Sequence, residues 1–449
     1  MEIAREIHAL GVSSLQANNI HGALIHFGKA LLMAPDLTEA SLFHGYCLDL
    51  LGRYEEALSA YDQALAGSPC LVAAWNNRGN TLLKLCRYEQ AVESYSRALD
   101  LAPGLLDARV ALATCFQALG LISEAMSACE AVLEADPGHA EAHWNKALLL
   151  LLNGDYRQGW REYEWRWRKR GFTSPLRDFT QPRWHGETFS GRTVLIHAEQ
   201  GFGDTLQFCR YVPLVAARGG RVVFECHPPL VPLMEGLVIG VSVVAMGQPL
   251  PPFDLHVPLM SLPMIFDTTM ETIPSAVPYL SPPTGHLLVW RDLVKDKKHL
   301  KVGLCWARKS FPDPGRSCPP KALGLLADVK GIEFYSLQVG YREGGMPLLP
   351  LIDLCDRIVD FADSAALISC LDLVISVDTA VAHLAGALGK ECWILLTIDP
   401  DWRWMIDRDD CPWYPSLRLF RQLYRGSWQD VIQRVKSELR DKAASPREN

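Results

Sequence analysis

The stretch "AAWNNRGNTLLKLCRYEQAVESYSRALDLAP" (residues 73–103) reads as two short helices joined by a turn and closed by a proline. Similar stretches precede and follow it at a constant step of 34 residues. Three columns of residues keep this step. The prolines are Pro35, Pro69, Pro103 and Pro137; the small residues are Gly11, Gly45, Gly79, Ala113 and Ala147; the bulky residues are Phe27, Tyr61, Tyr95, Cys129 and Tyr163. The first part of the chain is therefore a repeat.

A period of 34 residues, with small residues where two helices touch, is the signature of tetratricopeptide repeats. We expect about five repeats over residues 1–170, stacked into an α-solenoid because one helix pair cannot bury its apolar face alone. Such solenoids offer a concave groove that usually binds protein segments. Asn76, Asn77 and Asn80 lie on the first helix of the third repeat. We predict that their amides hold a peptide backbone in that groove.

Composition excludes several classes of protein. The 449 residues are 49% hydrophobic and carry a net charge of −7, which disfavours a nucleic-acid partner. The aromatic and basic segment 160–170 is therefore predicted to be the second helix of the last repeat. No apolar run approaches a membrane span, and the opening residues show no secretory signal. The 13 cysteines are scattered without a CxxC pair, so we expect no zinc site and a cytoplasmic location.

The remaining chain alternates strands and helices. Residues 171–191 are rich in Pro, Gly and Trp and are predicted to be a linker. We expect parallel-sheet, Rossmann-like lobes at 192–285 and 300–426, followed by a helix and tail at 427–449. The strands predicted in the two lobes are 192–199, 221–227, 241–247, 301–307, 332–340, 357–361, 371–377 and 391–397, and a strand edge followed by a helix is predicted at 254–266. Ligands of such sheets bind beyond the carboxyl ends of the strands.

The segment "HAEQGFGDTLQF" (197–208) follows the first of these strands. It begins like a dinucleotide-binding fingerprint, but Leu206 replaces the third glycine, so that interpretation fails. Two roles remain open for Asp204, a helix cap or a general base, and its position at a helix start is expected to lower its pKa. His197 and Glu199 are alternative bases. Gln200, Gly201 and Gly203 are predicted to leave room for an acceptor.

The segment "SVDTAVAHLAGALGK" (376–390) places a second set of polar residues directly after a buried strand. Asp378 and Thr379 are predicted to cap the following helix, whose N-terminus is a potential anion site. His383 lies one turn further on, where its ring could reach a phosphate. A plain helix cap with a structural histidine is the alternative.

Together these features resemble a known combination. The repeats, the segment around Asp204 and the stretch "DTAVAHLAGALGKECWILLTIDPDWRWMIDRDDCPWYPSLRLFRQ" resemble the bacterial tetratricopeptide-containing glycosyltransferases. The catalytic half is similar to glycosyltransferase family 9, the heptosyltransferases, and more loosely to protein O-GlcNAc transferases. The resemblance implies a GT-B fold, a nucleotide-sugar donor in the C-terminal lobe and inverting transfer without a metal or other cofactor.

The resemblance also assigns roles to residues. It places the catalytic base on Asp204. The donor diphosphate falls on Asp378, Thr379, Ala380 and His383, with Ala380 in place of the family's usual glycine. Cations for the leaving group are expected from Arg308, Lys309 and Arg316. The D-x-D pair of Asp399 and Asp401 receives no metal role. The aromatic residues that could stack on a nucleobase, or pack between the lobes, are Trp402, Trp404, Trp413 and Tyr414.

Three functions are compatible with the sequence. The first is glycosylation of a protein acceptor that the repeats recruit. The second is heptosyltransferase-like transfer to a lipid-linked glycan. The third is a non-catalytic repeat scaffold whose transferase half is degenerate, which the residue Ala380 slightly favours.

Overall fold

The computed structural model describes residues 1–295, 298–308, 314–342 and 344–444. The chain divides into two compact units. The first, here called the repeat unit, comprises Met1–Leu149 and Arg168–Arg170. The second, here called the α/β unit, comprises Leu150–Trp167 and Gly171–Asn449.

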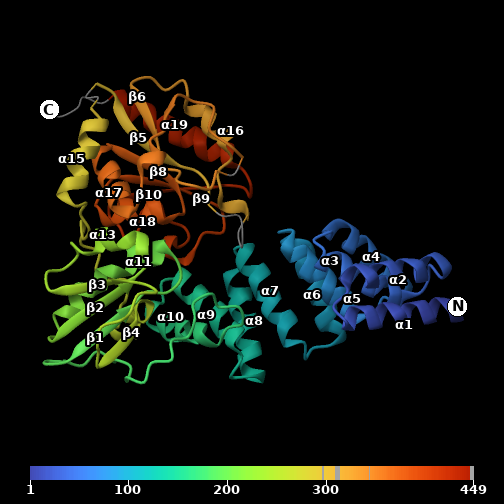
Figure 1. The fold of residues 1–449 in the computed structure, drawn as a ribbon. Helices are drawn as coiled ribbons and strands as arrows, with labels where there is room; N and C mark the ends of the chain where they lie inside the picture. The colour runs from blue at the N-terminus through green and yellow to red at the C-terminus, as the bar shows by residue number, and fades with distance from the viewer. Residues whose placement is uncertain (296–297, 309–313, 343, 445–449) are drawn as a thin grey trace. The chain divides into compact units, whose positions relative to one another are not determined.

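The repeat unit consists of helices in successive antiparallel pairs (Figure 1). They are α1 (Glu2–Gln16), α2 (Ile20–Met33), α3 (Thr38–Leu50), α4 (Tyr54–Gly67), α5 (Val72–Lys84), α6 (Tyr88–Leu101), α7 (Leu106–Ala118), α8 (Ile122–Ala135) and α9 (Ala140–Leu152), whose end from Leu150 onward belongs to the α/β unit. The proline column explains where the second helix of a pair ends. A residue before proline is pushed out of the helical conformation. Ala34, Ser68, Ala102 and Asp136, which cap α2, α4, α6 and α8, all have extended backbones with φ between −136° and −145°.

The small and bulky columns explain how the paired helices pack. A Cβ atom on Gly11 would lie 2.6 Å from the ring of Phe27. The same construction on Gly45 gives 2.7 Å to the ring of Tyr61. Small residues are therefore required where an aromatic ring of the partner helix closes onto the backbone. None of the helices in the described ranges combines the length and apolarity that crossing a membrane would need.

The last helix pair does not stay within the repeat unit. Residues 1–170 were predicted to form the solenoid, whereas Leu150–Trp167 belongs to the α/β unit. This segment contains α10 (Tyr156–Tyr163) and most of η1 (Glu164–Arg168). The ring of Trp160 is 1% exposed and meets the edge of Trp402 at a centroid distance of 5.3 Å. The aromatic face of α10 is thus part of the core of the second unit.

The segment 171–191, predicted to be a linker, is packed onto the first lobe of the α/β unit. It has no helix or strand, but Trp184 is fully buried. The backbone N–H of Trp184 donates to the carbonyl of His256 at 2.8 Å, and Arg183 forms a parallel bridge with the same residue. The segment therefore extends the edge of the first sheet.

The first lobe is built on a parallel sheet with the strand order β3-β2-β1-β4. Its strands are β1 (Thr193–His197), β2 (Arg221–Cys226), β3 (Val241–Ala245) and β4 (Leu255–Pro258). Short helices connect them: α11 (Phe202–Phe208), α12 (Val212–Ala216), α13 (Val231–Met234) and α14 (Leu262–Ile265). Helix α15 (Thr284–Leu293) follows. The strands predicted at 192–199, 221–227 and 241–247 are present, and the strand edge and helix predicted at 254–266 correspond to β4 and α14.

The second lobe is built on a parallel sheet of order β10-β9-β8-β5-β6-β7. Its strands are β5 (Leu300–Cys305), β6 (Ile332–Ser336), β7 (Leu351–Ile352), β8 (Leu373–Val377), β9 (Cys392–Leu396) and β10 (Leu417–Arg421). The strand predicted at 357–361 is wrong, because Arg357 ends a 3-10 turn and the side chain of Asp360 caps α17 (Phe361–Cys370). The actual edge strand is β7, and β10 was not predicted.

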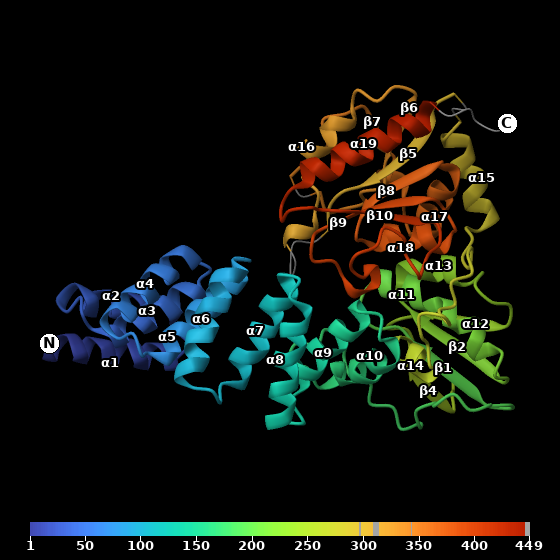
Figure 2. The ribbon, with the colours of Figure 1, turned by 180° about the vertical axis from the view of Figure 1, so that it is seen from behind.

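Helices cover both faces of the six-stranded sheet. Helices α17 and α18 (Ala380–Ala387) lie on one face (Figure 1), and α16 (Pro320–Leu323) and α19 (Trp428–Ala444) lie on the other (Figure 2). Trp428, Ile432 and Val435 of α19 are buried against Leu304 and Ile375 of the sheet. A helical solenoid followed by parallel sheets with helices confirms the predicted α + α/β fold class.

Candidate functional site

Asp204 lies in the first turn of α11, just beyond the carboxyl end of β1. Gly201 caps this helix, and Asp204 is its third residue. The Oδ2 atom of Asp204 accepts the backbone N–H of Gly201 at 2.8 Å. Asp204 is thus not the N-cap that the sequence suggested, but it does cap the helix from the third position, and this bond occupies one oxygen of the carboxylate.

The other oxygen of Asp204 faces the second lobe. Oδ1 forms an ion pair with Nη2 of Arg403, and the Asp204 side chain is 18% exposed. Burial raises the pKa of the Asp204 carboxyl, and this effect outweighs the lowering by Arg403 and by the Gly201 N–H. The expectation of a lowered pKa is thus corrected. The helix start does act in the expected direction, but the sequence did not reveal that the second lobe covers the carboxylate.

Arg403 and Asp204 belong to a larger set of paired charges. Asp401 accepts from Nη1 of Arg403 at 2.9 Å and lies 3.9 Å from Arg316. Arg316 in turn donates to Oδ2 of Asp378 at 3.0 Å, and Arg308 lies 3.6 Å from the same oxygen. We call this set the charge chain; its members are Asp204, Arg403, Asp401, Arg316, Asp378 and Arg308.

The charge chain lies where the fold would place a ligand. Asp204 follows β1, Arg308 follows β5, Asp378 follows β8 and Asp401 follows β9. Parallel sheets bind ligands beyond the carboxyl ends of their strands. Four members were predicted from the sequence as site residues, whereas Arg403 was not predicted and Asp401 was expected to have no metal role. The signal for both was "DWRW" directly after a buried strand. Lys309, predicted as a further cation, lies outside the described residues.

The helix after Asp378 has the predicted start. Thr379 is the N-cap of α18, but its side chain makes no capping bond and instead lies 3.0 Å from the Ser376 hydroxyl. Ala380 is the first helical residue. The positive end of the α18 dipole therefore points to the end of β8 beside Asp378.

His383 does not face an open anion site. Its ring is 4% exposed, its Nδ1 lies 2.9 Å from the Tyr414 hydroxyl, and it stacks on Trp404 at 5.3 Å. Burial lowers the pKa of His383 to about 3, so the ring is neutral near pH 7. The prediction that this ring reaches a phosphate fails in this arrangement, and the structural alternative fits.

Gly203 meets this buried histidine. A Cβ atom added to Gly203 would lie 2.8 Å from Cδ2 of His383, so the glycine permits close packing of α11 on α18. The predicted room for an acceptor is filled at this position. Gln200 and Gly201 remain beside Asp204; Gly201 is exposed, and Gln200 adopts a left-handed backbone with φ 63°. A non-glycine residue in that region is strained, which is common at functional sites.

We expect Gly203→Ala to destabilise the α/β unit by about 1–3 kcal/mol. The added methyl group would overlap His383, and that ring is held by Tyr414 and Trp404. Urea denaturation followed by tryptophan fluorescence would measure the change. Gly285→Ala in α15 is the matched control, because a Cβ atom there meets nothing within 4 Å. Equal stabilities of the two variants would contradict the packing role of Gly203.

Neutral His383 also predicts a pH dependence of stability. Its folded-state pKa of about 3 lies below the ordinary value of 6.5, so below pH 6.5 the unfolded chain binds a proton that the folded chain does not. Stability should fall by up to about 1.4 kcal/mol per pH unit as the pH drops through this window. Urea unfolding between pH 7 and pH 5 should show a shallower slope for His383→Gln than for wild type. Parallel slopes would contradict a neutral buried ring.

The aromatic residues near the charge chain are core residues. Trp404, Trp413 and Tyr414 are fully buried, and Trp402 is 4% exposed. Trp402 and Trp413 pack against Phe208 of the first lobe, with ring centroids 6.4 and 5.7 Å apart. Of the two roles considered, packing between the lobes is the one observed, and no nucleobase could stack on these rings without rearrangement.

The alternative bases are also structural. His197 is 3% exposed, and burial lowers its pKa to about 3. Glu199 is 1% exposed at its side chain and forms a two-pronged pair with Arg166, at 2.7 and 2.8 Å. Neither side chain is accessible, so Asp204 is the remaining candidate base of the three.

The predicted peptide-binding asparagines lie on α5 of the repeat unit. Asn80 is exposed, and its Oδ1 accepts the Tyr95 hydroxyl at 2.8 Å. Asn76 and Asn77 are partly exposed. A role in binding a peptide stays a prediction.

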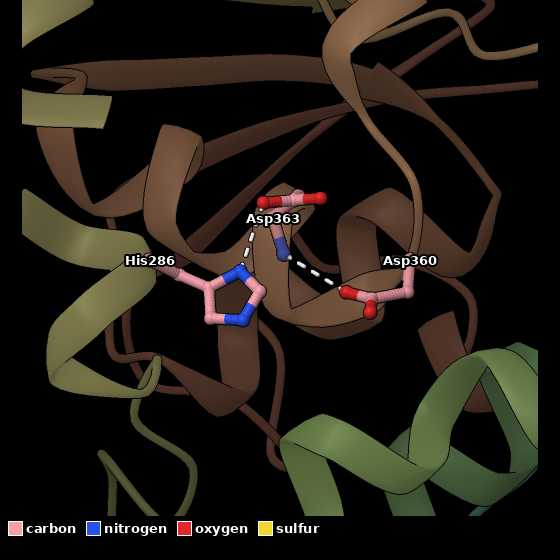
Figure 3. A group of neighbouring side chains, drawn as sticks. All are labelled: His286, Asp360 and Asp363. Atoms are coloured by element: carbon pink, nitrogen blue, oxygen red, sulfur yellow. Dashed lines mark hydrogen bonds and ion pairs between the residues drawn. The ribbon is translucent and has the colours of Figure 1, made fainter. Parts of the chain in front are cut away.

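One group of side chains in the described residues has the spacing of a metal site: His286, Asp360 and Asp363 (Figure 3). Oδ1 of Asp363 lies 2.9 Å from Nδ1 of His286 and accepts the indole N–H of Trp290 at 3.0 Å. Oδ1 of Asp360 accepts the backbone N–H groups of Ala362 and Asp363. These contacts start helix α17 and join it to α15, which accounts for the group without an ion.

Known protein families match both the repeat region and part of the α/β unit. Tetratricopeptide repeat families match residues 8–69 and 110–158, and also 72–105. Glycosyltransferase family 9 (heptosyltransferase) matches residues 348–395, a segment that contains Asp378 and His383. The resemblance to a repeat-containing glycosyltransferase is confirmed to this extent.

Individual relatives match different parts of the chain. The chain is 29% identical over 361 residues to Protein FlbA of Caulobacter vibrioides (strain ATCC 19089 / CIP 103742 / CB 15), covering 73% of this chain and 60% of FlbA. It thus spans about 60% of the length of that relative. The crystal structure of YrrB, "a TPR protein with an unusual peptide-binding site", is 24% identical with a TM-score of 0.33, covering 35% of this chain and 82% of YrrB. The structure of MamA 41-end from Desulfovibrio magneticus RS-1 is 19% identical with a TM-score of 0.35, and the match covers 36% of this chain and 91% of MamA 41-end.

Proposed function

We propose that the α/β unit is an inverting glycosyltransferase of GT-B type that uses a nucleotide-sugar donor. The observation that carries the proposal is the charge chain: Asp204 from the first lobe and the cations beside Asp378 from the second lobe converge at the carboxyl ends of two parallel sheets. The family 9 match over residues 348–395 supports the class of reaction. Asp204 lies on the first lobe and Arg316 and Arg308 lie on the second, an arrangement that suits transfer between an acceptor and a donor bound by different lobes.

The proposed reaction is a direct displacement at the anomeric carbon. Asp204 takes the proton of an acceptor hydroxyl, and the oxygen attacks the carbon from the face opposite the nucleotide. The bond to the diphosphate breaks, and the diphosphate leaves with the electron pair. Its charge is stabilised by Arg316, Arg308 and the N-terminus of α18, so the step needs no metal ion. The raised pKa of Asp204 suits a base, since a carboxylate with a very low pKa accepts protons poorly.

Donor binding must exchange partners within the charge chain. Arg316 and Arg308 both face Asp378, and their side chains are 20% and 29% exposed. An arginine fork binds a phosphate as well as a carboxylate. We propose that the diphosphate takes over the guanidinium groups that Asp378 holds here.

We further propose that the acceptor is a protein bound by the repeats, since such arrays usually bind protein segments. A lipid-linked glycan is the alternative acceptor, and the heptosyltransferase description of family 9 favours it. A cytoplasmic location fits either acceptor and stays a prediction.

A non-catalytic scaffold is a second candidate, favoured by a specific observation. Asp204 and Asp378 are both paired with arginines, so the charge chain is satisfied without any ligand. In that case the family 9 segment would serve only as a structural platform.

Donor binding distinguishes these candidates. We expect calorimetric titration with uridine, guanosine, adenosine and cytidine diphosphates to show binding of at least one. For that nucleotide, Arg316→Gln should weaken binding at least about tenfold, because a phosphate-binding arginine is lost. Arg418→Gln is the matched control, since Arg418 pairs with Glu438 at the surface. Absence of binding by every nucleotide would support the scaffold.

A further inference from the structure

We infer that Arg403 is the positioning residue for Asp204, fixing the orientation and the charge state of its carboxylate from the opposite lobe. The catalytic meaning of this inference rests on the proposed function. The contact between the Arg403 guanidinium and the Asp204 carboxylate, and its effect on the charge of that carboxylate, do not depend on the proposed function.

The contacts of Arg403 leave its guanidinium little freedom. Nη2 pairs with Asp204, Nη1 donates to Asp401 at 2.9 Å, and Nε donates to Oε1 of Gln207 at 2.6 Å. The group also lies over the ring of Trp402, 4.3 Å from its centroid. Every nitrogen of the side chain is engaged, and the side chain is only 9% exposed.

Gln207 shows that this arrangement is built for the arginine. Its side chain is fully buried, and its amide oxygen accepts from Arg403. Its amide nitrogen has no hydrogen-bond partner in the part of the chain that the structure describes. Burying an amide without a full set of hydrogen bonds costs free energy. The bond from Arg403 to the amide oxygen of Gln207 offsets part of that cost. Asp204 and Gln207 lie one turn apart on α11, so Arg403 hydrogen-bonds to two side chains on the same face of that helix.

The backbone near these residues is strained on both lobes. Met405 and Asp407, just after Arg403, have φ values of 55° and 53°. Gln200, shortly before Asp204, has φ 63°. Left-handed conformations at non-glycine residues persist only where the surroundings enforce them, and they concentrate at functional sites.

Among the charged groups around Asp204, Arg403 has the main influence that keeps the carboxyl ionised. Asp401 and Asp378 raise the pKa of Asp204, as burial does, whereas Arg403 lowers it. Tyr163 and His227 also face Asp204, and the buried ring of His383 lies behind Gly203. Of these neighbours, Arg403 is the cation in direct contact. Without it, the carboxylate would be buried beside two like charges and would take up a proton at higher pH.

The test measures Asp204 directly in the full chain, with no donor or acceptor present. Aspartate carboxyl carbons are labelled with ¹³C, and the Asp204 signal is identified by its loss in Asp204→Asn. We expect Arg403→Gln to raise the titration midpoint of Asp204 by about one to three pH units. Arg403→Lys, which keeps the charge but loses the fork, should shift it less while still lowering any transfer rate. Arg418→Gln, at an exposed surface pair, should leave the midpoint unchanged.

A second variant covers the case in which Arg403→Gln does not fold. Asp401→Asn removes a like charge and should lower the midpoint of Asp204. An unchanged midpoint in both Arg403→Lys and Asp401→Asn, or in Arg403→Gln where it folds, would overturn the inference. Failure of the proposed function would instead appear as absent nucleotide binding and transfer in wild type, whatever the titration shows.

Discussion

Asp204→Asn should reduce glycosyl transfer by about 10²- to 10⁴-fold, the usual contribution of a general base. Asparagine has nearly the same shape and its amide oxygen still accepts the N–H of Gly201, but its amide nitrogen then faces Arg403, and it cannot take a proton from a hydroxyl. Intact-mass analysis of candidate acceptor proteins co-expressed with each variant would measure the transfer. The same analysis of glycolipid fractions covers a lipid-linked acceptor.

The control for this variant is Asp410→Asn. Asp410 also pairs with an arginine, Arg408, but its side chain is 67% exposed and lies outside the charge chain. It should transfer as wild type does. If Asp204→Asn also transferred at the wild-type rate, the carboxylate would be only a helix cap. A loss of nucleotide binding in Asp204→Asn would point to disrupted lobe packing instead of a lost base.

Arg166→Ala should destabilise the α/β unit by about 3–5 kcal/mol, the usual cost of leaving a buried charge without its partner. Arg166 has no exposed surface, and it pairs with Glu199 and Glu164 while donating to the Ser261 hydroxyl at 2.8 Å. Removing the guanidinium leaves Glu199, 1% exposed, in the interior. The midpoint of urea denaturation, followed by tryptophan fluorescence, would report the loss.

A double variant separates the buried charge from the packing. Arg166→Met with Glu199→Met removes both charges and keeps most of the volume, so it should cost less than Arg166→Ala. Arg53→Ala is the surface control, since its pair with Glu56 is exposed on both sides and should contribute little. A cost below about 1 kcal/mol for Arg166→Ala would show that the pair of Arg166 with Glu199 does not fasten η1, directly after α10, to the first lobe.

The repeats were predictable from the sequence because their packing is local and periodic. Each proline follows the end of a helix, and each glycine of the small-residue column packs against a ring of the adjacent helix, as Gly11 packs against Phe27. The strands around the site were predictable for the same reason: β1, β5 and β8 are short apolar runs bounded by polar residues. The segment 357–361 has a similar pattern, yet the capping bonds of Asp360 decide in favour of a helix start.

The candidate site was only partly predictable, because its contacts join distant parts of the chain. Asp204 and Arg403 are 199 residues apart, and no pattern in either local segment predicts that they pair. The pKa of Asp204 was predicted in the wrong direction for the same reason, since the helix start is local and the burial is not. His383 shows the converse error: its motif position suggests a ligand contact, and tertiary packing buries it.

The most direct test of the central claim is a crystal structure of the chain with a nucleotide-sugar bound. We predict that the diphosphate lies at the N-terminus of α18 beside Asp378, with Arg316 donating to its oxygens and Asp204 facing the anomeric carbon. A nucleotide bound elsewhere, or a sugar whose anomeric carbon faces away from Asp204, would contradict the account.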